Sequence, residues 1–251
     1  MFDKRFIKMI AVVLMLAVAA VVLSSCVKET PTDDDGTGDS GKTPVEKVTT
    51  TGDDKIELTL VLPKPVAGGT ERTPNVENMQ ETPESARPVM YVPAGTTNVA
   101  LGKPVTATDD APIGGGLEKL VDGDVEGTDG SGLEFGLFDQ NVTVDLGSKH
   151  EMYAIMIWHY FAQTRVYYDV VVQIADDADF TQNSQILFNN DTDNSLGLGI
   201  GTDKHYKETL YGKLIDAKGA QGRFVRFHSN GNDVNELNHY IEVAVYGKPV
   251  E

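Results

Sequence analysis

The chain has 251 residues, of which 40% are hydrophobic and 24% are charged, so its composition is that of a folded protein rather than a disordered one. It contains 21 Lys and Arg residues against 38 Asp and Glu residues, and this net charge of −17 argues against a nucleic-acid partner. A single cysteine excludes a disulfide framework and a zinc site built on several thiolates.

Residues 1–25 have the pattern of a signal peptide. A basic stretch, Lys4 to Lys8, precedes an uninterrupted apolar run, Met9 to Leu23, which is shorter than the roughly 20 residues of a membrane span. The run ends in Leu23-Ser24-Ser25-Cys26, which resembles a bacterial lipobox. We therefore expect lipidation at Cys26, a membrane anchor through that lipid, and an extracytoplasmic place in a bacterial cell envelope, at the outer membrane or the cell surface. The alternative is an uncleaved anchor with an incidental cysteine.

Residues 26–54 are poor in large apolar side chains and rich in Thr, Asp, Gly, Lys and Pro, which predicts an acidic disordered tether. Glu29 and Asp33 to Asp35 weakly resemble the acidic export signal of some surface lipoproteins. Residues 55–96 begin with an alternating strand pattern, Lys55 to Pro63, and continue as a proline-rich arm. That arm is either packed along the main domain or loose.

Residues 97–248 contain short apolar stretches separated by Gly, Asn and Asp clusters, and no sustained helical period. Short strands at this spacing predict an all-β sandwich or jelly roll of about eight strands. The expected strands are 142–146, 153–158, 166–175, 185–188, 208–211, 223–228 and 241–246.

Five motifs follow one another in this domain: Asn98 to Ala107, Leu120 to Asp124, Val142 to Gly147, Gly222 to Phe227 and Ile241 to Gly247. Their order and spacing resemble the coagulation-factor type C, or discoidin-like, family, which includes carbohydrate-binding module family 32. The resemblance implies a galactose-binding-like β-sandwich with ligand loops at one end.

Two departures from that family pattern stand out. The family usually has a tryptophan after the Asp-Gly-Asp turn, and here Leu133 or Phe135 is the expected packing residue. The segment Asn189 to Thr202 is similar to an insertion, and its acidic first part, Asn189 to Asn194, is expected to be a solvated turn.

A structural Ca²⁺ site is implied by the same resemblance. Asp122, Asp124 and Thr128 lie in one oxygen-rich loop, and Glu242 on the last strand matches the glutamate that completes the site in relatives. The alternative is a plain turn in which Asp122 caps backbone amides.

Aromatic and charged side chains crowd the segment between two apolar strands that follows Trp158. His159, Tyr160, Phe161 and Arg165 supply a flat face for a sugar ring and donors for its hydroxyls, and we expect Arg165 at the surface. Trp158 itself is expected to be a core residue.

A second candidate loop runs from His228 to His239. Asn230, Asn232, Asn238 and His239 offer donors and acceptors that suit hydroxyl recognition, but asparagines suit turns equally well. We expect both loops to reach the same end of the sandwich.

The expected function is a lipid-anchored, non-catalytic protein that binds a glycan or polysaccharide for adhesion or capture. No nucleophile elbow, paired metal histidines or phosphate loop is present in the sequence. The alternative is a structural envelope lipoprotein whose sandwich binds another protein. A glycosidase, which would need two carboxylates at a set distance, is a more remote third.

Overall fold

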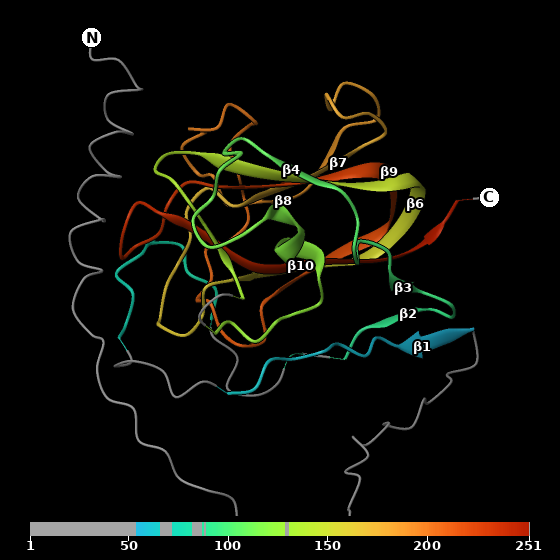
Figure 1. Cartoon of the computed structure of the whole chain (residues 1–251), viewed down its shortest axis with the longest axis horizontal. Coiled ribbons are helices and arrows are strands. Elements are labelled where there is room, and N and C mark those ends of the chain that lie inside the picture. The colour runs from blue at the N-terminus through green and yellow to red at the C-terminus, as the bar shows by residue number, and fades with distance from the viewer. Residues whose placement is uncertain (1–53, 66–71, 82–86, 88, 129–130, 251) are drawn as a thin grey trace, which may run out of the picture. The chain divides into compact units, whose positions relative to one another are not determined.

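The computed structural model describes residues 54–65, 72–81, 87, 89–128 and 131–250 (Figure 1). The expected signal peptide, Cys26 and all of the expected tether but Asp54 lie outside the described residues. Within them, no helix is long and apolar enough to cross a membrane. The described elements are β1 (Lys55–Glu57), β2 (Tyr91–Pro93), β3 (Thr97–Asn98), β4 (Val105–Ala107), η1 (Leu117–Val121), β5 (Leu133–Phe135), β6 (Gln140–His159), β7 (Val171–Ala175), β8 (Gln185–Asn189), β9 (Lys213–Ser229) and β10 (Asn238–Pro249).

The strands form two antiparallel layers. One layer has the order β4, the first half of β6, the second half of β9, β7 and β8. In the other layer β10 lies between β6 and the short strands β3 and β5, and the second half of β6 also pairs with the first half of β9. This is the all-β sandwich that the sequence predicts, with one 3₁₀ helix in the described residues.

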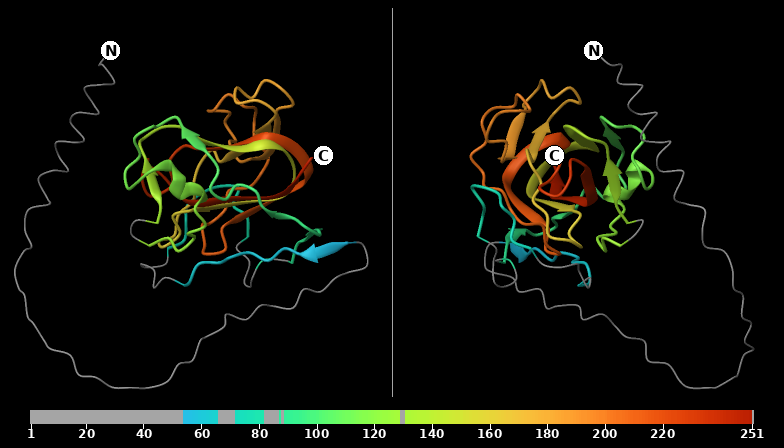
Figure 2. Two further views of the ribbon diagram at one scale, coloured as in Figure 1. Left: turned by 45° about the vertical axis from the view of Figure 1, so that its right-hand side comes forward. Right: turned by 90° about the vertical axis from the view of Figure 1, so that its left-hand side faces the viewer.

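Strands β6 and β9 belong to both layers because each folds over (Figure 2). Their pairing shifts register between Asp145 and His150, where Gly147 has a φ of 85°. On β9 the bend contains Lys218 and Gly219, with φ values of 53° and 78°. The expected strands 142–146 and 153–158 are parts of one strand, which corrects the prediction. Pairing with β9 shifts register at the bend and resumes at His150, so β6 runs from Gln140 to His159.

Side chains of β6 alternate between two apolar clusters. Ile155 and Ile157 face the core between the layers, whereas Met156 and Trp158 pack in a second cluster with Ile241. Both faces of this half-strand are buried, which is why its sequence is an almost continuous apolar run. The expected core position of Trp158 is confirmed, since only 1% of its surface is exposed.

Other expectations on packing and on strand ends have mixed outcomes. Leu133 and Phe135 are both buried, which confirms them as packing residues. The expected strand 208–211 is absent from the described structure, where β9 begins only at Lys213. The expected strand 166–175 is formed only from Val171 onward, and β1 is shorter than the alternation predicted.

The arm before the sandwich is packed where the structure describes it. Leu60 contacts the Trp158 cluster. The Arg87 guanidinium lies 2.9 Å from Sδ of Met156 and donates to the carbonyl of Gly212 at 3.4 Å. The arm therefore shields an apolar face that would otherwise meet water.

A chain that begins at Thr97 should be less stable than the full chain, because it loses the cover over Met156 and Trp158. Trp158 is the only tryptophan, so its emission reports on this cluster directly. We expect a red-shifted emission maximum and a lower melting temperature. Identical spectra and melting temperatures would show that the arm does not shield the cluster.

Candidate functional site

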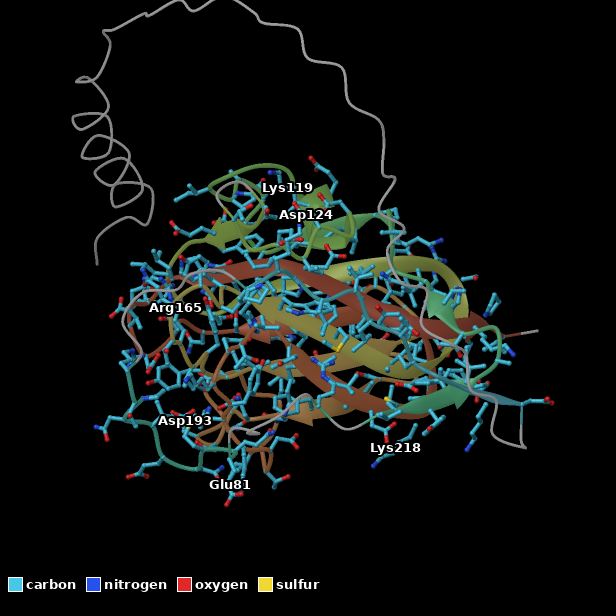
Figure 3. All side chains as sticks on the ribbon, turned by 90° about the horizontal axis from the view of Figure 1, so that it is seen from below. Glu81, Lys119, Asp124, Arg165, Asp193 and Lys218 are labelled. Atoms are coloured by element: carbon cyan, nitrogen blue, oxygen red, sulfur yellow. The ribbon has the colours of Figure 1, made fainter. Side chains whose placement is uncertain are left out.

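Strand ends gather at one end of the sandwich, which we call the loop end. Because β6 folds over, both Gln140 and His159 lie there, with the last residue of β9 and the first of β10. Four segments connect strands there: residues 136–139, 160–170, 190–212 and 230–237. Figure 3 shows Arg165 and Asp193, from two of these segments, toward one end of the strands and Lys218 toward the other.

The two loops that the sequence singled out are hydrogen-bonded to each other. The amide of Tyr168 donates to the carbonyl of Gly231 at 3.1 Å, and the amide of Asn230 donates to the carbonyl of Tyr168 at 3.0 Å. The amide of Asp233 donates to the carbonyl of Val166 at 3.0 Å. Both loops reach the same end, as expected, and their backbones hold each other in place.

His159 is a core residue, so its expected contact with a sugar is wrong. Its side chain has no exposed surface, and Nδ1 lies 2.6 Å from Oε1 of Glu208. The ring stacks on Tyr167 at 4.3 Å between centroids. The physical reason is that β6 runs as far as His159, which makes this residue the end of a buried strand.

The structure brings together the side chains of Tyr160, Arg165 and His239. Their main contacts are with one another. The Arg165 guanidinium lies 4.6 Å from the centre of the Tyr160 ring, and its Nη1 is 3.2 Å from Nδ1 of His239. Nε2 of His239 is 3.1 Å from Oε2 of Glu134. Burial, and then the neighbouring Arg165 and His159, lower the pKa of His239 to about 4, so the ring is neutral at pH 7. Arg165 is 8% exposed, which corrects its expected surface position.

Asn232 and Asn238 hold the loop in shape through side-chain hydrogen bonds. Asn238 is fully buried and its amide group donates to the carbonyls of Gly136 and Phe138 at 3.0 and 2.9 Å. Its Oδ1 accepts from the amide of Gly231 at 2.8 Å. Asn232 bonds within its own turn in the same way. For these two residues the structural alternative is correct.

Phe161 also serves packing, because its ring lies against the Trp158 cluster. Of the eight expected sugar contacts, Asn230 and Asn232 line a hollow at the loop end.

Two hollows flank Tyr168 and Asn230, and we call them together the groove. The larger, of about 570 Å³, is lined by Tyr168, Asn230, Asn75, Val76, Glu77, Asn78, Asp169, Thr192, Asp193 and His205. The smaller, of about 290 Å³, is lined by Tyr168, Asn230, Phe138, Gly231, Asn232, Asn235 and Glu236.

The groove offers two aromatic side chains beside polar ones. Phe138 is 74% exposed, and Tyr168 is half-buried with its ring edge-on to His205 at 5.9 Å. Asn230 donates through Nδ2 to Asp169 at 2.8 Å. Apolar ring faces with a few convergent polar groups are the usual composition of a small-molecule site.

Sequence reasoning missed Phe138, Tyr168, Asp169 and His205. Residues 166–175 have the apolar, β-branched pattern of a strand, so Tyr168 was placed within one. The structure instead uses Val166 to Val170 as a loop bonded to residues 230–233. The hydrogen-bond partners that decide this lie more than 60 positions away in the chain.

The expected solvated turn at Asn189 to Asn194 is formed only in its second half, where residues 192–194 are exposed. Asn189, Asn190 and Asp191 are buried, and the Asp191 carboxylate accepts from the amides of Ser195 and Leu196, each at 3.0 Å. Carboxylate oxygens of Asp169, Asp191 and Asp193 all lie within 4.8 Å of one another. It is the one such group of three among the described residues.

The turn at Asp122 to Asp124 lies against Glu242. Glu242 is fully buried, Oε1 accepts from the amide of Gly123 at 3.2 Å, and Oε2 has no hydrogen-bond partner among the described residues. Burial, and then the charge of Asp122, raise the pKa of Glu242 to about 9. Thr128 bonds elsewhere, with Oγ1 3.0 Å from Oγ of Ser131. Asp122 Oδ1 accepts from the amide of Asp124 at 2.8 Å, as in the plain-turn alternative, and the amide of Gly123 joins this turn to the buried Glu242.

No protein-family model matches the chain. No curated protein matches its sequence. A solved structure of truncated AlyQ, with CBM32 and alginate lyase domains, is 20% identical with a TM-score of 0.43, and the match covers 59% of this chain and 32% of that one. A fucose binding module of Streptococcus pneumoniae, SpX-3, is 19% identical with a TM-score of 0.42, over 60% of this chain and 97% of the module. A family 89 glycoside hydrolase from Clostridium perfringens is 18% identical with a TM-score of 0.44, over 61% of this chain and 15% of the enzyme.

The chain therefore spans about a third of truncated AlyQ and a smaller share of the hydrolase. Carbohydrate-binding modules are among these similar structures.

Arg165→Ala should lower the free energy of unfolding by about 1–3 kcal/mol, because it leaves buried polar partners unpaired. The matched control is Arg223→Ala. Arg223 pairs with Asp145 at 2.7 Å but is 42% exposed, so its loss should cost less than about 1 kcal/mol. Chemical denaturation of both variants tests the difference, and equal losses would contradict the buried role of Arg165.

Proposed function

We propose that the protein is a non-catalytic carbohydrate-binding protein that uses the groove at the loop end. The observation that supports this most directly is the pair of hollows around Tyr168 and Asn230, one of which has the exposed Phe138 in its wall. An aromatic ring can pack on the C–H face of a sugar, while amide and carboxylate groups bind its hydroxyls. The names of the similar structures, a fucose binding module and a CBM32 domain, agree with this class of ligand.

The buried residues beneath the groove have a supporting role in this proposal. Arg165 and His239 fix the loop from below, and Asn238 ties residue 231 to the segment that presents Phe138. A preorganised loop loses less conformational freedom when a ligand binds.

We also propose that a lipid on Cys26 holds the protein at a bacterial cell envelope. The lipobox-like motif and the preceding apolar run support this. Glycan capture at a surface would then be the role of the sandwich, with adhesion or polysaccharide retention as the outcome.

Tyr168→Ala should weaken binding of a glycan found by array screening at least tenfold, because the sugar loses its stacking face. A tenfold loss corresponds to about 1.4 kcal/mol. Calorimetry on the variant measures the change. Tyr91→Ala is the control, since Tyr91 is 44% exposed on β2, outside the residues that line the groove. Unchanged affinity in Tyr168→Ala would place the site elsewhere. Failure of all glycans to bind would favour the protein-interaction alternative.

As a second proposal, Asp122, Asp124 and Glu242 hold a structural Ca²⁺. A buried carboxylate oxygen without a partner is costly, and a bound cation would offset that cost. Backbone carbonyls of the turn would complete an oxygen shell. Thr128 is not needed, because its hydroxyl bonds to Ser131.

Ca²⁺ should raise the melting temperature of the metal-stripped protein. At a hundredfold excess over Kd, a ligand that binds only the folded state stabilises it by about 2.7 kcal/mol. Glu242→Gln should abolish this response. Asp193→Asn is the matched control, because Asp193 belongs to the other carboxylate group, and it should keep the response. If the response were lost in Asp193→Asn but kept in Glu242→Gln, the ion would bind at the Asp169, Asp191 and Asp193 group, and the proposed site at Glu242 would be wrong.

A further inference from the structure

The carboxylates that line the groove have no cationic partner among its other lining residues. Glu77, Asp169 and Asp193 line the larger hollow, and Glu236 lines the smaller one. Among the described residues that line either hollow there is no lysine or arginine. The one basic side chain is His205, and burial lowers the pKa of its imidazole.

Cations that come near the groove are engaged elsewhere. Arg72 forms an ion pair with Asp233, and its Nε donates to the carbonyl of Thr164 at 3.2 Å. Lys213 donates to Oε1 of Gln80 at 3.0 Å, and its Nζ lies over the ring of Phe188 at 4.6 Å from the centre. Neither of these two side chains lines the groove.

Three carboxylates crowd together at one side of the larger hollow. Those of Asp169, Asp191 and Asp193 share a space in which Ser195 Oγ and Asn230 Nδ2 each donate to Asp169 at 2.8 Å. Neutral donors offset like-charge repulsion only in part. A ligand cation in the hollow would offset more of it.

His205 adds an independent sign of a missing partner. It is 7% exposed, it lines the larger hollow, and its Nδ1 has no hydrogen-bond partner in the described structure. Its place is set by the arm, because the amide of His205 donates to the carbonyl of Asn78 at 3.1 Å and its carbonyl accepts from Gln80 at 2.7 Å. The arm and the insertion together build this wall.

We propose that the groove selects glycans that carry protonated amino groups, such as glucosamine oligomers, and rejects anionic ones. This inference rests on the carbohydrate-binding function proposed above and specifies its ligand class. The ammonium groups would lie at Asp169 and Asp193, with the sugar ring on Tyr168. Charge-assisted hydrogen bonds of this kind are stronger than neutral ones.

The test is calorimetry of the full chain with glucosamine oligomers, N-acetylglucosamine oligomers of the same length and oligogalacturonate, at mildly acidic pH in EDTA. We expect glucosamine oligomers to bind at least tenfold more tightly than their N-acetylated counterparts, with affinity falling as salt rises. Oligogalacturonate should not bind.

Variants separate a specific site from general attraction to an acidic protein. Asp193→Asn and Asp169→Asn remove the charge but keep the size of the side chain, so each should weaken glucosamine binding at least fivefold and weaken binding of a neutral glycan by less. Asp216→Asn removes the same charge at the bend of β9, at the other end of the sandwich, and should have no effect.

Three results would overturn the inference. One is equal binding of acetylated and free oligomers with no effect of the aspartate variants, which leaves the carbohydrate function intact if Tyr168 still matters. Another is an equal loss in Asp216→Asn, which would mean non-specific attraction. The third is binding of Ca²⁺ that depends on Asp193 without binding of any glucosamine oligomer, which would make the acidic group a metal site. Failure of every glycan, neutral or charged, would remove the proposed function as well.

Discussion

The fold-over of β6 and β9 is the constraint on which the rest of the structure depends. Each strand forms hydrogen bonds in both layers, so both ends of β6 arrive at one end of the sandwich. The loops after His159 and after Ser229 are then close enough to bond to each other. A bend at which pairing resumes after a register shift leaves few buried backbone groups unpaired, and unpaired groups would be costly. The strand pairing that joins the two layers of the sandwich therefore also brings the loops of the loop end together.

Beneath the loop end, polar side chains replace apolar packing. His159 with Glu208, and Arg165 with His239, form a buried polar layer among Tyr160, Tyr167 and Tyr240. Such groups fix loop geometry because each has few alternative partners. They have the chemical character of ligand-binding residues, and they hold the groove from below instead of facing it.

The acidic side chains of the protein have different effects at the surface and in places removed from water. On the surface a net charge of −17 serves solubility. At Glu242, however, the carboxylate is wholly removed from water, and that of Asp169 in the groove is partly removed, so that their charge is costly unless a cation is near. The proposed ligands, an amino sugar at Asp169 and Ca²⁺ at Glu242, are cations that would offset this cost.

The sequence by itself determined the class of fold. The five ordered motifs and the strand spacing lead to an antiparallel sandwich, and the apolar run around Trp158 leads to a half-strand buried on both faces. It also determined which two loops share an end, and that Glu242 joins the Asp122 turn. These results follow from local periodicity and from motifs in which residue type and spacing are enough.

Only the tertiary structure decided which side chains of those loops are buried. His159 and Asn238 have the composition of a site but are buried without any exposed surface, while Tyr168 has the pattern of a strand but borders the groove. The decision depends on where β6 ends and on bonds between residues 166–168 and 230–233, which are far apart in sequence. The walls of the groove come from the arm, the insertion and two loops, and no local pattern shows that they meet. Burial and charge at a site depend on such long-range contacts, so the groove became visible only in three dimensions.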